Sequence, residues 1–581
     1  MTSTTRSLFQ RRRLFGIGGA LLLVICLATA IVSSAQTFTT IAALRLAYND
    51  HPGAALAQAT NGNFYGTTSG GCCVSGTVFK ITPSGKVTSL HAFDGTDGAG
   101  LDARLVLATD GSIYGTTYSG GANNYGTVFK ITPAGTLTTL YNFCSQTNCA
   151  DGAYPVAGLT QATDGDLYGT TAGGNADSGF CSSGVCGTVF KMTLGGTLTT
   201  LYTFCPSGGP NCQDGYNPVA GLLQAANGDF YGTTSLGGAN NCTGAGCGTL
   251  FKITRAGELT TLYQFCSEAN CADGANPSSG LIQAEDGDLY GTTGAFGSLD
   301  PGTIYKVTQA GELTTLYRFC SKTNCADGIA PTSGLILATD ANFYGVTLAG
   351  GIRVKRCFWG EGCGTVFKIT PKGELTTLYS FSGYSDGAFP QGLLQSTNGT
   401  LYGTTGGYGA HRNGTVFSLS MGLGPFVAFV HDSGKVGWNA EILGQGFTGT
   451  TAVSFNGMPA AGFVVRRDTY LRATVPAGAT TGYLTVTTPS GTLTSNVVYR
   501  VLPQIISFSP TSGPVGTPVT ITGVSLTQTN KVAFGGVPAT DFTVNSDTQV
   551  TATVPTGAKT GKIVIVTTGG RTWSTQVFTV Q

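Results

Sequence analysis

The sequence predicts an all-β protein, a seven-bladed β-propeller of four-stranded blades followed by two β-sandwiches. Three observations lead to this fold class. Short segments recur along the chain, glycine contributes 89 of the 581 residues, and only 10% of the residues are charged. Such a composition favours many short strands joined by tight turns. The length and the apolar share of 41% allow several packed domains.

Three segments define the repeat. The first, YGTT or a close variant, begins at Tyr65, Tyr114, Tyr168, Tyr231, Tyr290, Tyr344 and Tyr402. The second, GTVFK or a variant, begins at Gly76, Gly126, Gly187, Gly248, Gly302, Gly364 and Gly414. The third, LTTLYxF or a variant, is centred on Leu90, Leu140, Leu201, Leu262, Leu316 and Leu378. Together with an apolar strand before each YGTT segment, they indicate four-stranded units repeated around a propeller.

Asn-Gly or Asp-Gly pairs precede most YGTT strands and predict two-residue hairpins in which both central residues adopt positive φ. The third segment has six copies against seven of the others. The stretch from Phe38 to Leu44, followed by Tyr48, resembles the missing copy, and the last unit ends after Ser418. We therefore expect the N-terminal strand to complete the last blade and close the ring, which leaves no open sheet edge.

Loop lengths predict two different faces of the propeller. The GTVFK glycine and the LTTLY leucine are 14 residues apart in all six copies, whereas the two other connections vary in length. Alternate connections of an antiparallel blade lie on one face, so the variable loops share a face.

The cysteine pairs lie in these variable loops. We expect disulfides between Cys144 and Cys149, Cys181 and Cys186, Cys205 and Cys212, Cys242 and Cys247, Cys266 and Cys271, Cys320 and Cys325, and Cys357 and Cys363. Adjacent Cys72 and Cys73 have no assigned state. Zinc is the alternative, but no pair has the spacing of a zinc knuckle.

The N-terminus reads as an export signal. Basic residues at 6 and 11–13 precede an apolar stretch and a small-residue cleavage site at Ser33-Ser34-Ala35, which predicts a signal peptide over residues 1–35. A retained signal anchor is the alternative. After cleavage we expect no membrane span. The net charge of +1 provides no basic surface, so nucleic acid is not an expected partner.

The repeats resemble the GloVer tandem repeats of exported bacterial "choice-of-anchor" proteins over about residues 37–420, on the basis of YGTT, GTVFK and LTTLYxF. The resemblance implies an exported protein with a secreted or surface location. Relatives often end in a sorting anchor, but this sequence ends in Phe578-Thr579-Val580-Gln581 without an apolar tail.

The remaining sequence resembles IPT/TIG modules, which have an immunoglobulin-like fold. The second copy, residues 503–581, carries the segments at 506–510, 519–523, 532–536 and 552–555, and a more diverged copy covers residues 424–502. The first copy has Phe429-Val430-His431-Asp432 in place of the usual SFSP opening. The resemblance implies spacer or adhesive modules without catalytic residues.

An acidic residue precedes each innermost strand and suggests a metal site. The Asp-Gly pairs begin at Asp97, Asp151, Asp214, Asp273, Asp327 and Asp386. Because the following strands should line the central channel, these carboxylates were candidates for a ring that holds calcium. The alternative is that each Asp accepts local backbone hydrogen bonds and shapes a tight loop. We favour the turn interpretation.

The loop from Arg353 to Cys363 is the candidate ligand-binding segment. It carries Arg353, Lys355, Arg356, Phe358 and Trp359 beside a cysteine pair. An aromatic side chain held in a disulfide-bonded loop can stack on a sugar ring or anchor a protein. The alternative is an aromatic ring packed beneath its own loop.

Catalytic patterns are sparse. The four histidines show no metal spacing, and the sequence contains no GxSxG, HExxH or P-loop. We therefore expect an exported binding or adhesion protein whose looped face contacts an extracellular polysaccharide or a surface protein. The alternatives are an extracellular carbohydrate-active hydrolase or lyase, and a purely structural surface protein.

Overall fold

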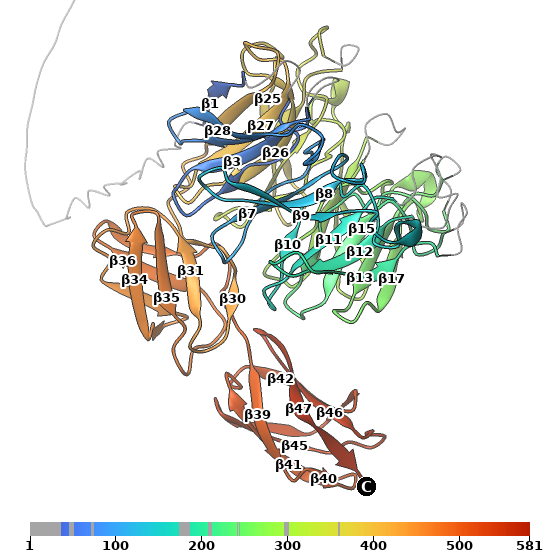
Figure 1. Cartoon of the computed structure of the whole chain (residues 1–581), viewed down its shortest axis with the longest axis vertical. Helices are drawn as coiled ribbons and strands as arrows, with labels where there is room; N and C mark the ends of the chain where they lie inside the picture. Colours follow the sequence, from blue (N-terminus) through green and yellow to red (C-terminus); the bar gives the residue numbers. More distant parts are fainter. Residues whose placement is uncertain are drawn as a thin grey trace, which may run out of the picture. The chain divides into compact units, whose positions relative to one another are not determined.

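The computed structural model describes residues 36–45, 51–70, 75–173, 186–206, 212–240, 242, 245–294, 301–357 and 361–581. The proposed signal peptide lies outside these residues. Seven antiparallel four-stranded sheets form the blades of a propeller, and further sheets form two sandwiches. The all-β fold class predicted from the repeats is thus confirmed (Figure 1).

Six of the blades run from an innermost strand to an outermost strand in chain order. The first three blades comprise β2 (Ala57–Gln58), β3 (Phe64–Thr68), β4 (Thr77–Ile81) and β5 (Val87–Ala92); β6 (Val106–Leu107), β7 (Ile113–Thr117), β8 (Thr127–Ile131) and β9 (Leu137–Asn142); and β10 (Thr160–Gln161), β11 (Leu167–Thr171), β12 (Thr188–Met192) and β13 (Leu198–Thr203). The next three comprise β14 (Leu223–Gln224), β15 (Phe230–Thr234), β16 (Thr249–Ile253) and β17 (Leu259–Gln264); β18 (Ile282–Gln283), β19 (Leu289–Thr293), β20 (Thr303–Val307) and β21 (Leu313–Arg318); and β22 (Ile336–Leu337), β23 (Phe343–Thr347), β24 (Thr365–Ile369) and β25 (Leu375–Ser380).

The seventh blade combines the two ends of the repeat region. It contains β26 (Ala388–Gln395), β27 (Leu401–Gly407), β28 (Thr415–Ser420) and, as its outermost strand, β1 (Thr37–Ala43). β1 pairs antiparallel with β28, and the two lie side by side in Figure 1 despite their separation in sequence. The register shifts at Ile41, as it does at Leu140 in β9, and Leu44 is fully buried, as Phe143 is. The N-terminal strand therefore reproduces the LTTLYxF strand of the other blades.

The YGTT segment is explained by packing. The tyrosine hydroxyl contacts the Asn or Asp four residues earlier, as between Tyr168 and Asp164 at 2.9 Å. The glycine lies against an aromatic ring of the next strand, since a Cβ on Gly232 would lie 2.5 Å from Cζ of Phe251. The final threonine bonds the threonine of the GTVFK strand, as between the hydroxyls of Thr234 and Thr249 at 2.8 Å. These contacts recur from blade to blade and define the repeat.

The Asn-Gly and Asp-Gly hairpins differ in geometry from our prediction. In the first blade Gly62 has φ of +76° and donates its backbone N–H to the carbonyl of Ala59. Asn61 does not adopt positive φ, and its side-chain oxygen accepts a hydrogen bond from the N–H of Asn63. The turn is therefore longer than two residues, and only its glycine needs the left-handed conformation.

Glutamines at the ends of the innermost strands link neighbouring blades. The side-chain oxygen of Gln224 accepts a hydrogen bond from the N–H of Thr163 in the preceding blade. The same bond joins Gln161 to Thr109, Gln283 to Ala226, Gln395 to Thr339 and Gln58 to Thr397. The last of these bonds crosses the closure between the seventh and first blades. These bonds fix the blades to one another at the face opposite the long loops.

The long loops meet at one face. Isolated bridges pair the loop that follows an outermost strand with the loop that follows the YGTT strand of the next blade, as Ala99 with Ser119 and Ile329 with Ala349. In the loop residues that the structure describes there are three short 3-10 helices, η1 (Thr147–Cys149), η2 (Ala269–Cys271) and η3 (Thr323–Cys325). We call this side of the propeller the looped face.

The two sandwiches share one strand order. In the first, a sheet of β29 (Ala428–Phe429), β31 (Asn439–Leu443), β35 (Tyr470–Thr474) and β34 (Gly462–Arg467) accompanies β33 (Met458–Pro459), β32 (Ala452–Phe455), β36 (Leu484–Thr488) and β37 (Gly491–Thr494), with β30 (Ser433–Gly434) paired to β38 (Arg500–Val501). In the second, β39 (Gln504–Ser509), β41 (Pro518–Val524), β45 (Gln549–Thr553) and β44 (Phe542–Ser546) accompany β40 (Ser512–Gly513), β47 (Gly570–Val580), β46 (Gly561–Thr567), β42 (Thr529–Phe534) and β43 (Val537–Pro538). The shared order supports reading residues 424–502 as a diverged copy of the second module.

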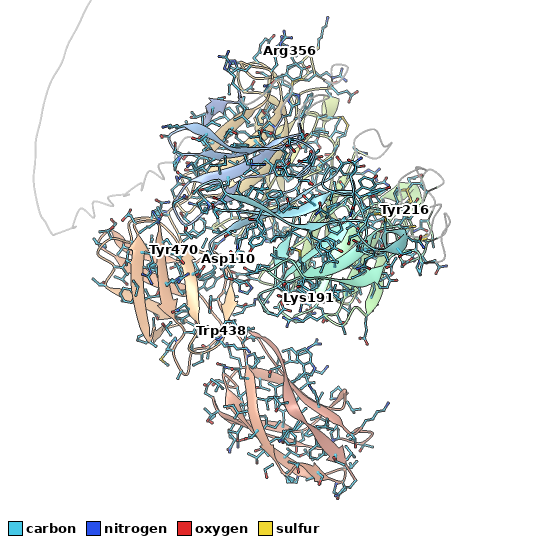
Figure 2. The ribbon with its side chains drawn as sticks, in the orientation of Figure 1. Asp110, Lys191, Tyr216, Arg356, Trp438 and Tyr470 are labelled. Atoms are coloured by element: carbon cyan, nitrogen blue, oxygen red, sulfur yellow. A yellow bond between two sulfur atoms is a disulfide. The ribbon has the colours of Figure 1, made fainter. Side chains whose placement is uncertain are left out.

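Four blades carry an acid-sensitive contact. Lysines of the GTVFK strands bind turn aspartates, with Nζ to carboxylate distances of 2.7 Å for Lys130 and Asp110 and 3.1 Å for Lys191 and Asp164, and Asp286 and Asp340 are bound in the same way. Figure 2 labels Asp110 and Lys191. Burial by itself would raise the pKa of Asp164, but hydrogen bonds from Tyr168 and Lys191 outweigh it and lower that pKa. The pKa values of Asp110, Asp286 and Asp340 are lowered against burial in the same manner.

We expect the propeller to lose stability as pH falls below about 4, the pKa of an unfolded aspartate. A carboxyl whose pKa is lower in the folded state stabilises it above the unfolded pKa, and that contribution is lost as pH falls through the folded value. A variant with Asp110→Asn, Asp164→Asn, Asp286→Asn and Asp340→Asn matches the Asn of the other units. Its melting temperature should fall less between pH 6 and pH 3 in calorimetry. Equal losses in the two proteins would contradict this assignment.

Candidate functional site

The six aspartates of the Asp-Gly pairs organise the loops. The carboxylate of Asp151 accepts hydrogen bonds from the hydroxyl of Tyr141, from the N–H and hydroxyl of Ser145, and from the N–H of Gln146. The same four bonds form at Asp273 and Asp327. Asp214 and Asp386 also accept tyrosine hydroxyls, and Asp97 lies 2.6 Å from the ring nitrogen of His91. Each carboxylate therefore connects its loop to an outermost strand.

The calcium hypothesis assumes that the six carboxylates face the central channel. Within the described residues, none of the six lines the central channel, because each is directed to a tyrosine or histidine of an outermost strand. Asp151, Asp273 and Asp327 are fully buried, and their four hydrogen bonds occupy the acceptor positions of a carboxylate. Calcium binding by the six aspartates stays a prediction.

Disulfides fasten the looped face. Bonds join Cys144 to Cys149, Cys205 to Cys212, Cys242 to Cys247, Cys266 to Cys271, Cys320 to Cys325 and Cys357 to Cys363. Cys72, Cys73 and Cys181 lie outside the described residues, so the expected bond of Cys181 to Cys186 is not described. The observed bonds agree with the local pairing that the sequence predicts.

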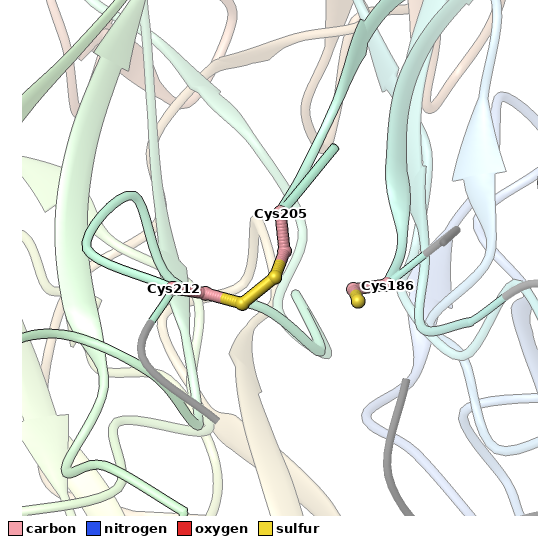
Figure 3. Close-up of side chains that lie close together, drawn as sticks. All are labelled: Cys186, Cys205 and Cys212. Carbon is pink, nitrogen blue, oxygen red and sulfur yellow. A yellow bond between two sulfur atoms is a disulfide. The ribbon is translucent and has the colours of Figure 1, made fainter. Parts of the chain in front are cut away.

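Cysteines from two loops of one blade lie together. The sulfur of Cys186 lies within 4.8 Å of the sulfurs of Cys205 and Cys212, which form a disulfide (Figure 3). These cysteines pack with Tyr216, also labelled in Figure 2, in a small buried cluster. Cys242 lies equally close to Cys266 and Cys271 in the next blade. Sulfur atoms thus form small cores beneath loops that have few other apolar residues.

Arg356 is part of an exposed aromatic cluster, which we call the Arg356 cluster. Its guanidinium lies 4.2 Å from the ring centre of Tyr384 and 5.8 Å from that of Tyr408. It also donates to the carbonyl of Gly383 at 2.9 Å, and the hydroxyl of Tyr408 donates to the Arg356 carbonyl at 2.5 Å. Tyr384 is 60% exposed, and Figure 2 shows Arg356 at the periphery of the propeller. The disulfide of Cys357 fixes the loop below, where Gly383 leaves room for both sulfurs.

The structure describes only some of the other residues predicted in this loop. Arg353 and Lys355 are exposed. Phe358 and Trp359 lie outside the described residues. Tyr384 and Tyr408 were not among the predicted residues, because they come from the following loops of the chain and only the fold brings them to Arg356. The ligand role assigned to Arg353, Lys355, Arg356, Phe358 and Trp359 stays a prediction.

A second aromatic group, the tyrosine cluster, lies on the looped face between the second and third blades. The ring centre of Tyr154 is 5.0 Å from that of Tyr118 and 5.5 Å from that of Tyr125. Tyr118 is 43% exposed, and its N–H donates to the carbonyl of Gly100 at 2.7 Å. Gly100 directly precedes the segment that enters the channel. The tyrosine cluster therefore borders the channel mouth.

The channel is a cavity of about 770 Å³ lined by the innermost strands, by the residues that lead into them and by residues of the first sandwich, among them Phe426, Asp432 and Arg500. Side chains face it in three layers. The mouth layer contains Gly53, Asp102, Val156, Val219, Ser278, Thr332 and Gln391; the middle layer contains Ala55, Arg104, Gly158, Gly221, Gly280, Gly334 and Gly392; and the base layer contains Ala57, Val106, Thr160, Leu223, Ile282, Ile336 and Leu394. The channel is polar near the loops and mainly apolar at its base.

In the middle layer, neighbouring blades approach one another closely. A Cβ on Gly158 would lie 2.9 Å from the carbonyl oxygen of Arg104, and one on Gly221 would lie 3.1 Å from that of Gly158. A Cβ on Gly392 would lie 2.9 Å from Cβ of Ala55. Small residues are therefore required around most of the ring, and Arg104 is the exception.

Asp102 and Arg104 are exposed and line the channel. Within the described residues, no hydrogen bond or ion pair joins either side chain to another group. Burial raises the pKa of Asp102, and burial lowers the pKa of Arg104. The other two charged residues of the lining, Asp432 and Arg500, form an ion pair at 2.8 Å.

Sequence analysis missed this pair, although a signal was present. Aligning the units places Arg104 of LDARL opposite the glycines of PVAGL, PSSGL and PTSGL. Comparing each unit with the others, and not only with the shared motif, would have identified the unit with a charged residue at this position.

Comparisons with solved structures find several at low identity. A fungal alcohol oxidase of the AA5 family in complex with copper is 13% identical, with a TM-score of 0.42, over 94% of this chain and 98% of that chain. A luciferin-regenerating enzyme is 11% identical, with a TM-score of 0.36, over 67% of this chain and 97% of that chain. A surface glycan-binding protein from Prevotella bryantii is 19% identical, with a TM-score of 0.21, over 26% of this chain and 41% of that chain. No curated protein matches the chain.

Family comparisons agree with the architecture. The IPT/TIG domain matches residues 503–580, which form the second sandwich. The Gloeobacter/Verrucomicrobia repeat matches residues 29–244, 179–417 and 243–464, and these matches together span all seven blades. The repeat covers most of the chain, and the chain belongs to the Gloeobacter/Verrucomicrobia repeat family.

Proposed function

We propose that this protein is an exported binding protein that holds an extracellular polysaccharide on the looped face of its propeller. The observation that carries the proposal is the pair of aromatic groups on that face, the tyrosine cluster beside the channel mouth and the Arg356 cluster. Tyrosines combine a large apolar ring with a polar hydroxyl and lose little conformational entropy on binding. Sugar rings present both C–H faces and hydroxyl groups, which match these two properties.

The construction of the face supports binding. Disulfides and buried aspartates fix the loops, so little ordering entropy is lost when a ligand binds. The positive φ of Tyr154 and Tyr408, 58° in both, places these aromatic residues in a backbone conformation that costs free energy and often occurs at functional sites. No helix in the described part of the chain has the length and apolar character to cross a membrane. The disulfides suit an oxidising, extracellular location.

The variants Tyr118→Ala and Tyr384→Ala test the proposal. Loss of a stacked ring at a binding hot spot costs about 2 kcal/mol, so each variant should bind the selected polysaccharide roughly thirtyfold more weakly. A glycan array of neutral and acidic polysaccharides selects the ligand, and isothermal calorimetry measures the affinity. Trp438→Ala is the matched control, since Trp438 is 52% exposed on the first sandwich. Its affinity should equal that of the wild type.

Two results would contradict the proposal. One is the absence of binding to every polysaccharide on the array. The other is a weaker affinity in Trp438→Ala together with an unchanged affinity in both tyrosine variants. This result would show that the polysaccharide binds the sandwiches. Release of shortened products from a bound polysaccharide would favour the alternative of a carbohydrate-active enzyme.

A further inference from the structure

We infer that the channel mouth binds the carboxylate of an acidic sugar through Arg104, so that the ligand of the looped face is a uronate-containing polysaccharide. This inference rests on the proposed function and names its ligand class. The propeller has one channel, and the tyrosine cluster borders its mouth next to Asp102 and Arg104. A chain that lies on the tyrosines can therefore place one sugar residue in the channel.

Arg104 presents a charged guanidinium to the channel without a protein partner among the described residues. A guanidinium stays charged in proteins, and an anionic ligand would supply its counter-charge. In the described part of the channel lining, the other arginine, Arg500, already has Asp432 as its counter-charge. A small residue in place of Arg104 would cause no steric clash, because the equivalent position is Ala55 in the first blade and glycine in the other five. An arginine at this position is therefore better explained by a ligand than by packing.

The surroundings favour a sugar carboxylate over other anions. The planar guanidinium fork matches a carboxylate in a bidentate arrangement. The carboxylate of Asp102, two residues away in the mouth layer, repels a dianion such as phosphate more strongly than it repels a singly charged carboxylate. Ser278, Thr332 and Gln391 of the same layer offer neutral hydrogen-bonding groups for hydroxyls.

The test compares oligogalacturonate with its methyl ester, in which each carboxylate is neutralised by an added methyl group. Isothermal calorimetry with the mature protein should give an affinity at least about tenfold higher for the acid, as expected for one charge-assisted contact. Arg104→Ala should remove that preference and leave the affinity for the methyl ester unchanged. Arg104→Lys keeps the charge without the planar fork and should give an intermediate preference. The melting temperature of Arg104→Ala should be no lower than that of the wild type.

The outcomes separate this inference from the proposed function. If the wild type binds acid and ester equally, or if Arg104→Ala keeps the preference, the inference is wrong while binding at the looped face stands. Displacement of oligogalacturonate by inorganic sulfate at matched ionic strength would show an unselective anion site and would also overturn it. If no polysaccharide binds at all, the proposed function itself fails.

Discussion

Removal of residues 36–45 is expected to destabilise the whole propeller, because β1 is the outermost strand of the last blade. Without it, the edge of β28 would be exposed, and exposed edges promote aggregation. Phe38 would leave its stacked position 3.7 Å from the ring centre of Tyr379, and fully buried Leu44 would leave its core. The single variant Leu44→Ala should cost about 2–5 kcal/mol. Thermal unfolding followed by circular dichroism and light scattering measures both effects.

Thr39→Ser is the control for these variants. Thr39 is exposed on the same strand, so its replacement should leave the melting temperature nearly unchanged. A synthetic peptide of residues 36–45 added to the truncated protein should raise its melting temperature towards that of the full chain. Unfolding of the truncated protein at the temperature of the full chain would show that β1 does not close the ring.

Gly232→Ala is expected to be severely destabilising although it adds a single methyl group. That methyl would lie 2.5 Å from Cζ of Phe251 and 2.8 Å from Cδ2 of Leu222, closer than carbon atoms approach. Overpacking of this kind costs about 1–3 kcal/mol or more. Denaturant unfolding measures the loss. Since this glycine contact recurs in each unit, it explains why the second letter of YGTT does not vary.

Two further variants test whether the clash with Phe251 causes the loss of stability in Gly232→Ala. Gly228→Ala lies in the same blade and meets nothing within 4 Å, but its φ is +86°, so only the left-handed conformation should cost free energy, about 1–2 kcal/mol. Phe251→Leu removes the atom that clashes, and it should restore part of the stability when combined with Gly232→Ala, a non-additive result in a double-mutant cycle. Additive losses would show that the contact is not the cause.

The fold was predictable because the residues that recur in each unit are the ones that pack the strands of a blade together. Seven copies of YGTT and GTVFK specify seven hairpins, and the stretch from Phe38 to Leu44 has the spacing of the outermost strand. The structure adds that Leu44 occupies the place of the final phenylalanine. The geometry of the Asn-Gly turns was predicted wrongly, since a dipeptide signal does not distinguish a two-residue turn from a longer turn that ends in the same glycine.

The candidate site was only partly predictable. The sequence placed the cysteine pairs and Arg356 in loops of one face, but it contains no information on which loops meet across blades. Tyr384 and Tyr408 therefore became visible only in the structure. The direction of a loop carboxylate was equally open, and Asp151 is directed to Tyr141 of an outermost strand and not to the channel. The unusual arginine at position 104 could have been found in the sequence by comparing the units with one another.

Hydrogen–deuterium exchange of the mature protein, with and without saturating oligogalacturonate, tests the central claim most directly. The account predicts that bound ligand protects amides on the looped face, in the segments 95–104, 118–125 and 382–391, and leaves residues 424–581 unchanged. Protection confined to residues 424–581 would contradict it, because the ligand would then bind the sandwiches and not the propeller.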